Sequence, residues 1–203
     1  SQNNYYDIII SEPSNPWIAG VAGLFSHEYY QTCASRLTDP GMMVQWIQVY
    51  NSSDEIFETI LASFSSAFPH IQIWWGSPGD LILIGTRQPI NPDPDELILR
   101  MQRPGVLNDL SKIQIEGPLA LLSRQIRGAG STRYIAPRTT QLHSDFFPIL
   151  EHMAQSAFFA RTASGLWRVY DERNLSASNL LLARYLTLHP LEASDLRAPI
   201  INQ

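Results

Sequence analysis

A short loop near the start of the chain carries the side chains that are best suited to chemistry. It contains an acid, Glu12, an amide three positions later, Asn15, and an indole, Trp17. A carboxylate in such a loop can accept a proton or hold a cation, and an amide adds a hydrogen bond. We therefore expect any chemistry of this chain to lie in this loop.

The residues before the loop predict the element that positions it. Asp7 is followed by Ile8, Ile9 and Ile10, an apolar run of β-branched residues. Such a run is typical of a strand that is buried on both faces inside a parallel sheet. Sheets of this kind bind ligands outside the carboxyl ends of their strands, which is where the loop lies.

The next elements alternate between helix and strand. The connection Gly76-Ser77-Pro78-Gly79 is too short for a crossover, so the two strands that it joins must be antiparallel. The predicted elements are a helix from Ser26 to Leu37, a strand from Met42 to Tyr50, a helix opened by Ser52 with Glu55 three residues later as a capping box, and strands from His70 to Trp75 and from Asp80 to Thr86.

The character of the chain changes after residue 88. Pro89, Pro92 and Pro94 mark a boundary between a region of 1–88 and a mainly helical C-terminal region of 89–203. The helices predicted beyond this boundary span 95–101, 107–113, 119–127 and 178–188.

Several motifs resemble one known family in the same order and at compatible spacing. They are YYDIIISEPSNPWIAGVAGLFSHEYYQTC, PGMMVQWIQVY and PGDLILIGTR, with a weaker likeness in LHSDFFPILEHMAQSAFF. The chain is similar to the spermidine synthase-like family, in particular to its bacterial branch with the SEPSNPW motif. This resemblance covers residues 5–88. It implies an α/β fold that is the C-terminal half of a class I methyltransferase-like Rossmann sheet, ending in an antiparallel hairpin and followed by a helical appendage.

The resemblance also implies an activity and a set of site residues. Family members transfer an aminopropyl group from decarboxylated S-adenosylmethionine to an amine, whose attacking nitrogen must lose a proton. The family places two aspartates after this strand, and the matching positions here hold Glu12 and Asn15. Glu12 is thus the expected catalytic residue, and the change from aspartate to Asn15 puts a diamine substrate in question. The expected substrate-binding residues are Asn15, Trp17, Gln45 and Trp75, and the expected cofactor-binding residues are Ser11 and Pro13.

The family holds its sulfonium substrate mainly with a glycine turn and an acid that precede the part matched here. We therefore expect residues 1–203 to bind S-adenosylmethionine, or its decarboxylated form, only when an N-terminal portion is supplied. Two other functions stay open. Asn15-Pro16-Trp17 is weakly similar to the Asn-Pro-Pro-aromatic signature of amino-group methyltransferases. Alternatively, the chain is a non-catalytic module in which Ile8 to Ile10 form an uncovered edge strand, which predicts a homodimer.

Composition excludes some classes of function. A net charge of −5, a pI near 5.5 and the absence of a basic run argue against a nucleic-acid surface. The one cysteine, Cys33, excludes a disulfide framework and indicates a reducing, cytoplasmic compartment. No apolar run reaches the roughly 20 residues of a membrane helix. No metal is expected, because His27-Glu28 lacks the second histidine that a zinc-protease helix has where Gln31 stands.

Overall fold

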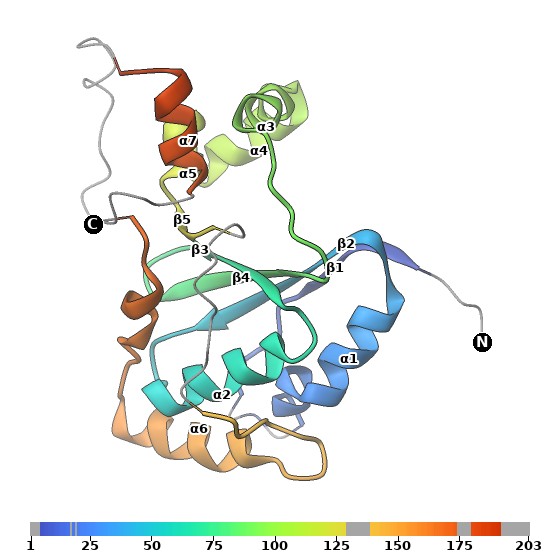
Figure 1. Cartoon of the computed structure of the whole chain (residues 1–203). Coiled ribbons are helices and arrows are strands. Elements are labelled where there is room, and N and C mark those ends of the chain that lie inside the picture. Colours follow the sequence, from blue (N-terminus) through green and yellow to red (C-terminus); the bar gives the residue numbers. More distant parts are fainter. Residues whose placement is uncertain (1–4, 17, 19, 129–138, 174–179, 192–203) are drawn as a thin grey trace.

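The computed structural model describes residues 5–16, 18, 20–128, 139–173 and 180–191. Within these residues the chain forms an α/β fold with one mixed sheet of five strands in the order β1-β2-β4-β3-β5, together with seven α-helices (Figure 1). This architecture is compatible with a Rossmann-like fold, so the predicted α/β class is confirmed.

The first strand, β1 (Tyr6–Ser11), pairs in parallel with β2 (Leu37–Gln48), and Ile8 and Ile10 lie opposite Met42 and Val44. The predicted strand is confirmed, but its predicted burial on both faces is wrong. Ile8 is 50% exposed and Ile10 is 72% exposed, because their side chains point to the face of the sheet on which their partners Met42 and Val44 are also only partly buried.

Helix α1 (His27–Arg36) begins as predicted, since the Ser26 hydroxyl accepts a hydrogen bond from the Tyr29 amide at 3.1 Å. It ends one residue early. Leu37 already belongs to β2, where it lies opposite Tyr6 and is 2% exposed. The pairing and burial of Leu37 outweigh its helix propensity.

Helix α2 (Asp54–Ser65) is capped by Ser53, whose hydroxyl accepts a hydrogen bond from the Ile56 amide at 3.3 Å. The predicted cap, Ser52, is therefore wrong by one residue. Ser52 instead pairs through its backbone with Thr162, donating from its amide and accepting the Thr162 hydroxyl hydrogen. These tertiary bonds fix Ser52 before the helix begins.

The strands β3 (His70–Trp75) and β4 (Asp80–Thr86) form the predicted antiparallel hairpin, and β4 lies between β2 and β3. A fifth strand, β5 (Gln125–Arg127), pairs antiparallel with β3. The helix predicted over 119–127 is wrong beyond α5 (Pro118–Leu122). All three residues of β5 are buried, so sheet pairing decides their conformation.

The α-helices lie on the two sides of the sheet (Figure 1). Helices α1, α2 and α6 cover one face, while α3, α4, α5 and α7 form a cluster on the other side, beyond β3 and β5 (Figure 1). Neither α6 nor the 3-10 helix η2 is indicated by the sequence, yet both contribute to the main core through Leu150, Ala154 and Trp167. The bounds are η1 (Ala22–Phe25), α3 (Pro94–Met101), α4 (Pro104–Lys112), α6 (Ile149–Ala160), η2 (Leu166–Tyr170) and α7 (Leu181–Leu188).

The segment before α6 is tied to the helical layer by His143, which is fully buried. Its amide donates to the Ser63 hydroxyl at 2.9 Å, and its carbonyl accepts from the His27 amide at 2.8 Å. The ring contacts the Ala22 carbonyl through Nε2 at 2.9 Å and accepts from the Leu150 amide at Nδ1, at 3.4 Å. This pattern requires the neutral ring with its proton on Nε2.

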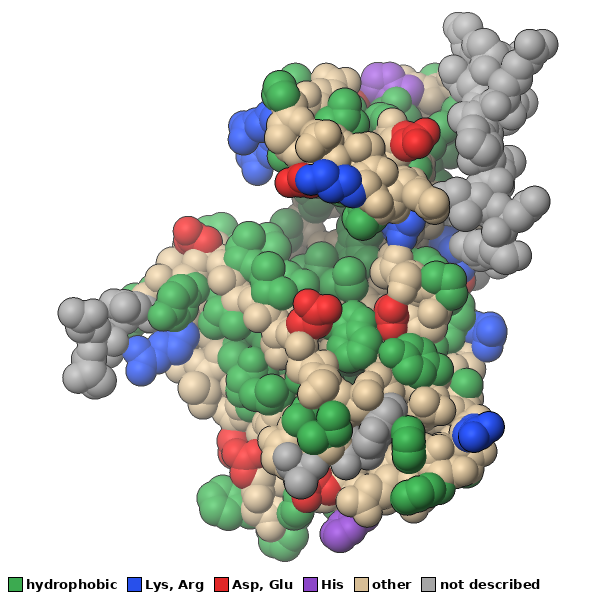
Figure 2. Space-filling view, turned by 180° about the vertical axis from the view of Figure 1, so that it is seen from behind, with side chains coloured by type: hydrophobic (Ala, Val, Ile, Leu, Met, Phe, Trp, Pro, Cys, Tyr) green, Lys and Arg blue, Asp and Glu red, His purple; other side chains and the backbone are tan. Residues whose placement is uncertain are grey.

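The two faces of the sheet are unlike. Residues that point toward α1 and α2, such as Met43 and Leu83, are fully buried. Residues that point the other way, such as Val44, Trp46 and Ile84, are only partly covered. Seen from behind, the molecule also exposes hydrophobic side chains across its middle (Figure 2). Within the described residues, the helices therefore cover only one face of the β1-β2 half of the sheet.

Candidate functional site

Three strands have their carboxyl ends on the same side of the sheet, which is called the carboxyl edge below. Because β2 and β3 are both antiparallel to β4, and β1 is parallel to β2, strands β1, β2 and β3 all run in one direction. Their carboxyl ends are Ser11, Gln48 and Trp75. The loop with Glu12 leaves the sheet at this edge, which is where α/β sheets bind ligands.

The residues of the loop differ in how accessible they are. Glu12 is exposed, and Asn15 is partly buried with its carbonyl accepting from the Ile18 amide at 3.0 Å. Ser11 and Pro13 are buried. The expected substrate residue Trp17 lies outside the described residues. Within the described part of the loop, Glu12 is the charged side chain that a ligand can reach.

Gln45 lies below this edge rather than on it. Its side chain is fully buried, and its amide nitrogen donates to the Trp46 carbonyl at 3.0 Å and weakly to the Ser11 carbonyl at 3.5 Å. Its Oε1 atom is buried and has no hydrogen-bond partner among the described residues. Gln45 therefore holds the end of β1 against β2, and it does not line the rim where Glu12 lies.

Trp75 ends β3 at the same edge and is partly buried. Its ring lies 5.0 Å from that of Trp167 in η2, and its amide donates to the Arg124 carbonyl at 2.7 Å. The Arg168 guanidinium carbon is 4.9 Å from the centre of the Trp167 ring, a cation–π distance. The structure thus brings Trp75 to the expected edge and adds an aromatic partner that the sequence does not indicate.

Two further residues at this edge, Asp80 and Tyr50, are not indicated by the sequence as site residues. Asp80 lies opposite Gln48 across the β2–β4 pairing. Its Oδ2 atom accepts from the Ser77 hydroxyl, and its Oδ1 atom is buried without a hydrogen-bond partner among the described residues. The ring of Tyr50 packs directly over Gly79, where a Cβ atom would lie 2.8 Å from Tyr50 Cδ1. Gly79 also has a φ of +92°, so the turn requires glycine for two reasons. Asp80 adds a second carboxylate, and Tyr50 adds an aromatic ring that is 42% exposed.

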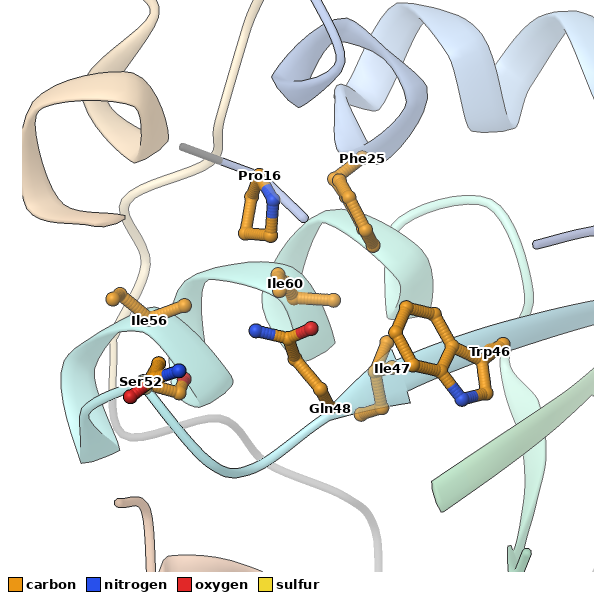
Figure 3. A pocket seen from close by; sticks show the side chains of 9 residues that line it. Pro16, Phe25, Trp46, Ile47, Gln48, Ser52, Ile56 and Ile60 are labelled. Atoms are coloured by element: carbon orange, nitrogen blue, oxygen red, sulfur yellow. The ribbon is translucent and has the colours of Figure 1, made fainter. Parts of the chain in front are cut away.

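A small cavity lies beneath the loop (Figure 3). Pro16 covers it, Phe25, Ile56 and Ile60 line it, and the amide of Gln48 reaches into it from β2 (Figure 3). The cavity has a volume of about 10 Å³, which is at the lower limit for one water molecule. Sites for drug-sized ligands measure roughly 300–1,000 Å³. The residues present therefore do not fit S-adenosylmethionine in this cavity.

Cys33 does not offer a nucleophile to this site. It is buried on α1, and burial raises the pKa of its thiol, which keeps it protonated. Within the described ranges, no three His, Cys, Asp or Glu side chains are grouped so that they could hold a metal ion. The same residues contain no helix that is long and apolar enough to cross a membrane.

Comparisons with known proteins do not add a family. No protein-family model matches the chain, and no curated protein matches it significantly.

Proposed function

We propose that this chain is the amine-binding part of a spermidine synthase-like transferase. The observation that carries the proposal is the position of the exposed acid Glu12 at the carboxyl end of β1. The strand order β1-β2-β4-β3, with β4 antiparallel to its neighbours, supports derivation from the C-terminal half of a class I methyltransferase-like sheet.

In this proposal the carboxylates at the edge attract a protonated amine. Glu12 accepts the proton that the attacking nitrogen must lose. Asp80, whose Oδ1 atom is buried and whose Oδ2 atom accepts from the Ser77 hydroxyl, adds a negative charge near the same end of the sheet without contacting the amine, and this charge offsets the loss of charge at Asn15. The faces of Trp75 and Tyr50 pack against the methylene groups of the amine and attract its ammonium ends, with about 0.5–2 kcal/mol for each cation–π contact.

The sulfonium donor is bound elsewhere in this proposal. The cavity under the loop admits about one water molecule, so the proposal places the nucleoside outside this cavity, on the N-terminal portion that the family resemblance implies. Isothermal titration of residues 1–203 with S-adenosylmethionine and with its decarboxylated form tests this point. We expect no measurable binding, and micromolar binding would contradict it.

Calorimetry with amines tests the proposed site itself. A few exposed charge and cation–π contacts give roughly 4 kcal/mol, which corresponds to a Kd near 1 mM. We expect a diamine to bind in this range, Glu12→Gln to weaken it by about threefold to tenfold, and Glu116→Gln, which removes an exposed acid between α4 and α5, to have no effect. Equal affinities of the chain and of Glu12→Gln would refute the role of Glu12.

A methyltransferase-type enzyme uses the same kind of sheet, so the fold alone does not separate the two activities. The preference of the site for different amines distinguishes the two activities. An aminopropyl acceptor site favours diamines over monoamines, because two carboxylates lie at the edge. A site that prefers a planar, neutral amine would instead support the methyltransferase.

The second candidate function is a non-catalytic module that associates with itself. It is favoured by the exposure of Ile8 and Ile10 on a strand that pairs on one side only within the described residues. In this case amines do not bind at Glu12, and the chain forms a homodimer through β1.

A further inference from the structure

A short segment before α6, residues 139–148, lies against the helical layer and is called the strap here. It is the orange segment that leads into α6 (Figure 1). His143 is the one buried residue of the strap, while Phe146 and Phe147 are 80% and 74% exposed. Segments that bury few apolar side chains open at a lower free-energy cost than the rest of a domain. The attachment of the strap therefore depends mainly on His143.

His143 connects the strap to three separate elements. Its amide donates to the Ser63 hydroxyl in α2 at 2.9 Å, and its carbonyl accepts from the His27 amide in α1 at 2.8 Å. Its ring bonds through Nε2 to the Ala22 carbonyl in η1 at 2.9 Å. Ala22 is fully buried and follows the loop that carries Glu12. The strap thus fixes the end of this loop that lies far from β1.

The ring of His143 has room for one proton in this arrangement. Nε2 carries it toward the Ala22 carbonyl, and Nδ1 accepts from the Leu150 amide at 3.4 Å. A second proton on Nδ1 would place two donors against each other and break the bond to Leu150. It would also leave a positive charge on a fully buried ring.

The charged groups around the ring act in both directions. Asp145 on the strap, Glu28 on α1 and Glu151 on α6 favour the protonated ring. His27 on α1 disfavours it when it is itself charged, and the groups of α2 and η1 that contact His143 are uncharged. Burial has the largest effect and lowers the pKa of the ring. The neutral ring is therefore the form that fits the closed strap.

We propose that the strap is a pH-dependent latch on η1, which the neutral ring of His143 closes and a second proton on this ring opens. The open form binds this proton near pH 6.5, and the closed form binds it only at lower pH. The closed form is thus fully favoured above pH 6.5, and opening becomes easier as the pH falls from 6.5 toward the lowered pKa of the closed form. The equilibrium constant for opening rises by up to about tenfold between pH 7.5 and 5.5.

This inference goes beyond the proposed function and does not depend on it. The loop that the strap fixes is the one that carries Glu12, so an open latch would also change the proposed amine site. The experiment observes the strap and the loop without an amine. A failure of the latch and a failure of amine binding are therefore separate results.

Amide hydrogen exchange measured by nuclear magnetic resonance tests the latch, with rates corrected for the pH dependence of the chemical step. The amides of His27, His143 and Leu150 lose their hydrogen bonds on opening, so we expect them to be at least tenfold less protected than the amides of β3 and β4. Their protection should fall by up to about tenfold between pH 7.5 and 5.5, and the amides of Val21 and Gly23, beside Ala22, should shift over the same range. Protection equal to that of β3 and β4 would mean that the strap opens only on global unfolding, which would overturn the proposal.

Two histidine variants separate the buried ring from the other titrating groups. His143→Gln should remove the pH dependence of exchange in the strap, and the control His152→Gln, at an exposed position on α6, should retain it. The same fall in protection in His143→Gln would contradict the latch. The ring resonances of His143 in the unaltered chain supply a measurement that needs no variant. They should titrate below pH 6.5, and a midpoint at or above 6.5 would also contradict the proposal.

Discussion

Acidification should destabilise this protein through His143 before its carboxylates titrate. Burial lowers the pKa of the His143 ring, against smaller opposing effects from the Ala22 carbonyl and from Asp145, Glu151 and Glu28. A proton on Nδ1 would also face the Leu150 amide, which already donates to this atom. In the unfolded chain the ring binds its proton near pH 6.5. Stability is therefore complete above pH 6.5 and falls as the pH decreases from 6.5 to the lowered pKa of the folded state.

One proton bound only by the unfolded state costs at most about 1.4 kcal/mol per pH unit. This is a measurable part of the roughly 5–15 kcal/mol that stabilises a domain. The pKa of Glu28 is also lowered, chiefly by the hydroxyl of Ser144, but from 4.5, so its contribution to stability is lost only at lower pH. The slope between pH 6.5 and 5.5 should thus report on His143.

Urea denaturation at pH 7.5, 6.5 and 5.5 measures this slope. We expect the chain to lose stability between the last two pH values, His143→Gln to be less stable at pH 7.5 but nearly independent of pH, and His152→Gln to behave as the unaltered chain because His152 is exposed. An identical slope in the chain and in His143→Gln would refute the reasoning.

Two further predictions concern the fold and are checked by the same denaturation assay. Ser53→Ala should cost about 1 kcal/mol by removing the cap of α2, and a neutral result would show that the helix begins elsewhere. Gly85→Ala should cost about 1–3 kcal/mol or more, because its Cβ would lie 2.5 Å from Phe64 Cε1 and 2.7 Å from Phe68 Cβ. Gly105→Ala on α4 has open space and should be neutral or stabilising by up to about 1 kcal/mol, so equal losses at both glycines would contradict the packing.

Short sequence patterns are sufficient to predict β1, the start of α1 and the β3–β4 hairpin. The run Ile8 to Ile10 gives the parallel strand, Ser26 gives the start of α1, and the short turn before Asp80 requires an antiparallel pair. Each of these depends on residues that are close together in the sequence. The sequence-based predictions fail where a residue far along the chain determines the local conformation. Ser52 is held by hydrogen bonds with Thr162, and β5 forms by pairing with β3.

The same distinction applies to the candidate site. The position of Glu12 follows from the strand before it, and the placement of Trp75 at the same edge follows from the strand directions. The contact of Trp75 with Trp167 depends on η2, which lies about ninety residues further along the chain and has no strong helical pattern. Asp80 reads as an ordinary turn residue until its pairing opposite Gln48 places it at the edge.

In the proposed function, an amine binds where β1, β2 and β3 reach their carboxyl ends. Nuclear magnetic resonance of the ¹⁵N-labelled chain, titrated with a diamine, locates the bound amine. We expect shifts in the amides around Glu12 and Asp80 and in the indole of Trp75, and their loss in the variant Glu12→Gln. Shifts confined to other parts of the chain, or none at millimolar diamine, would contradict it.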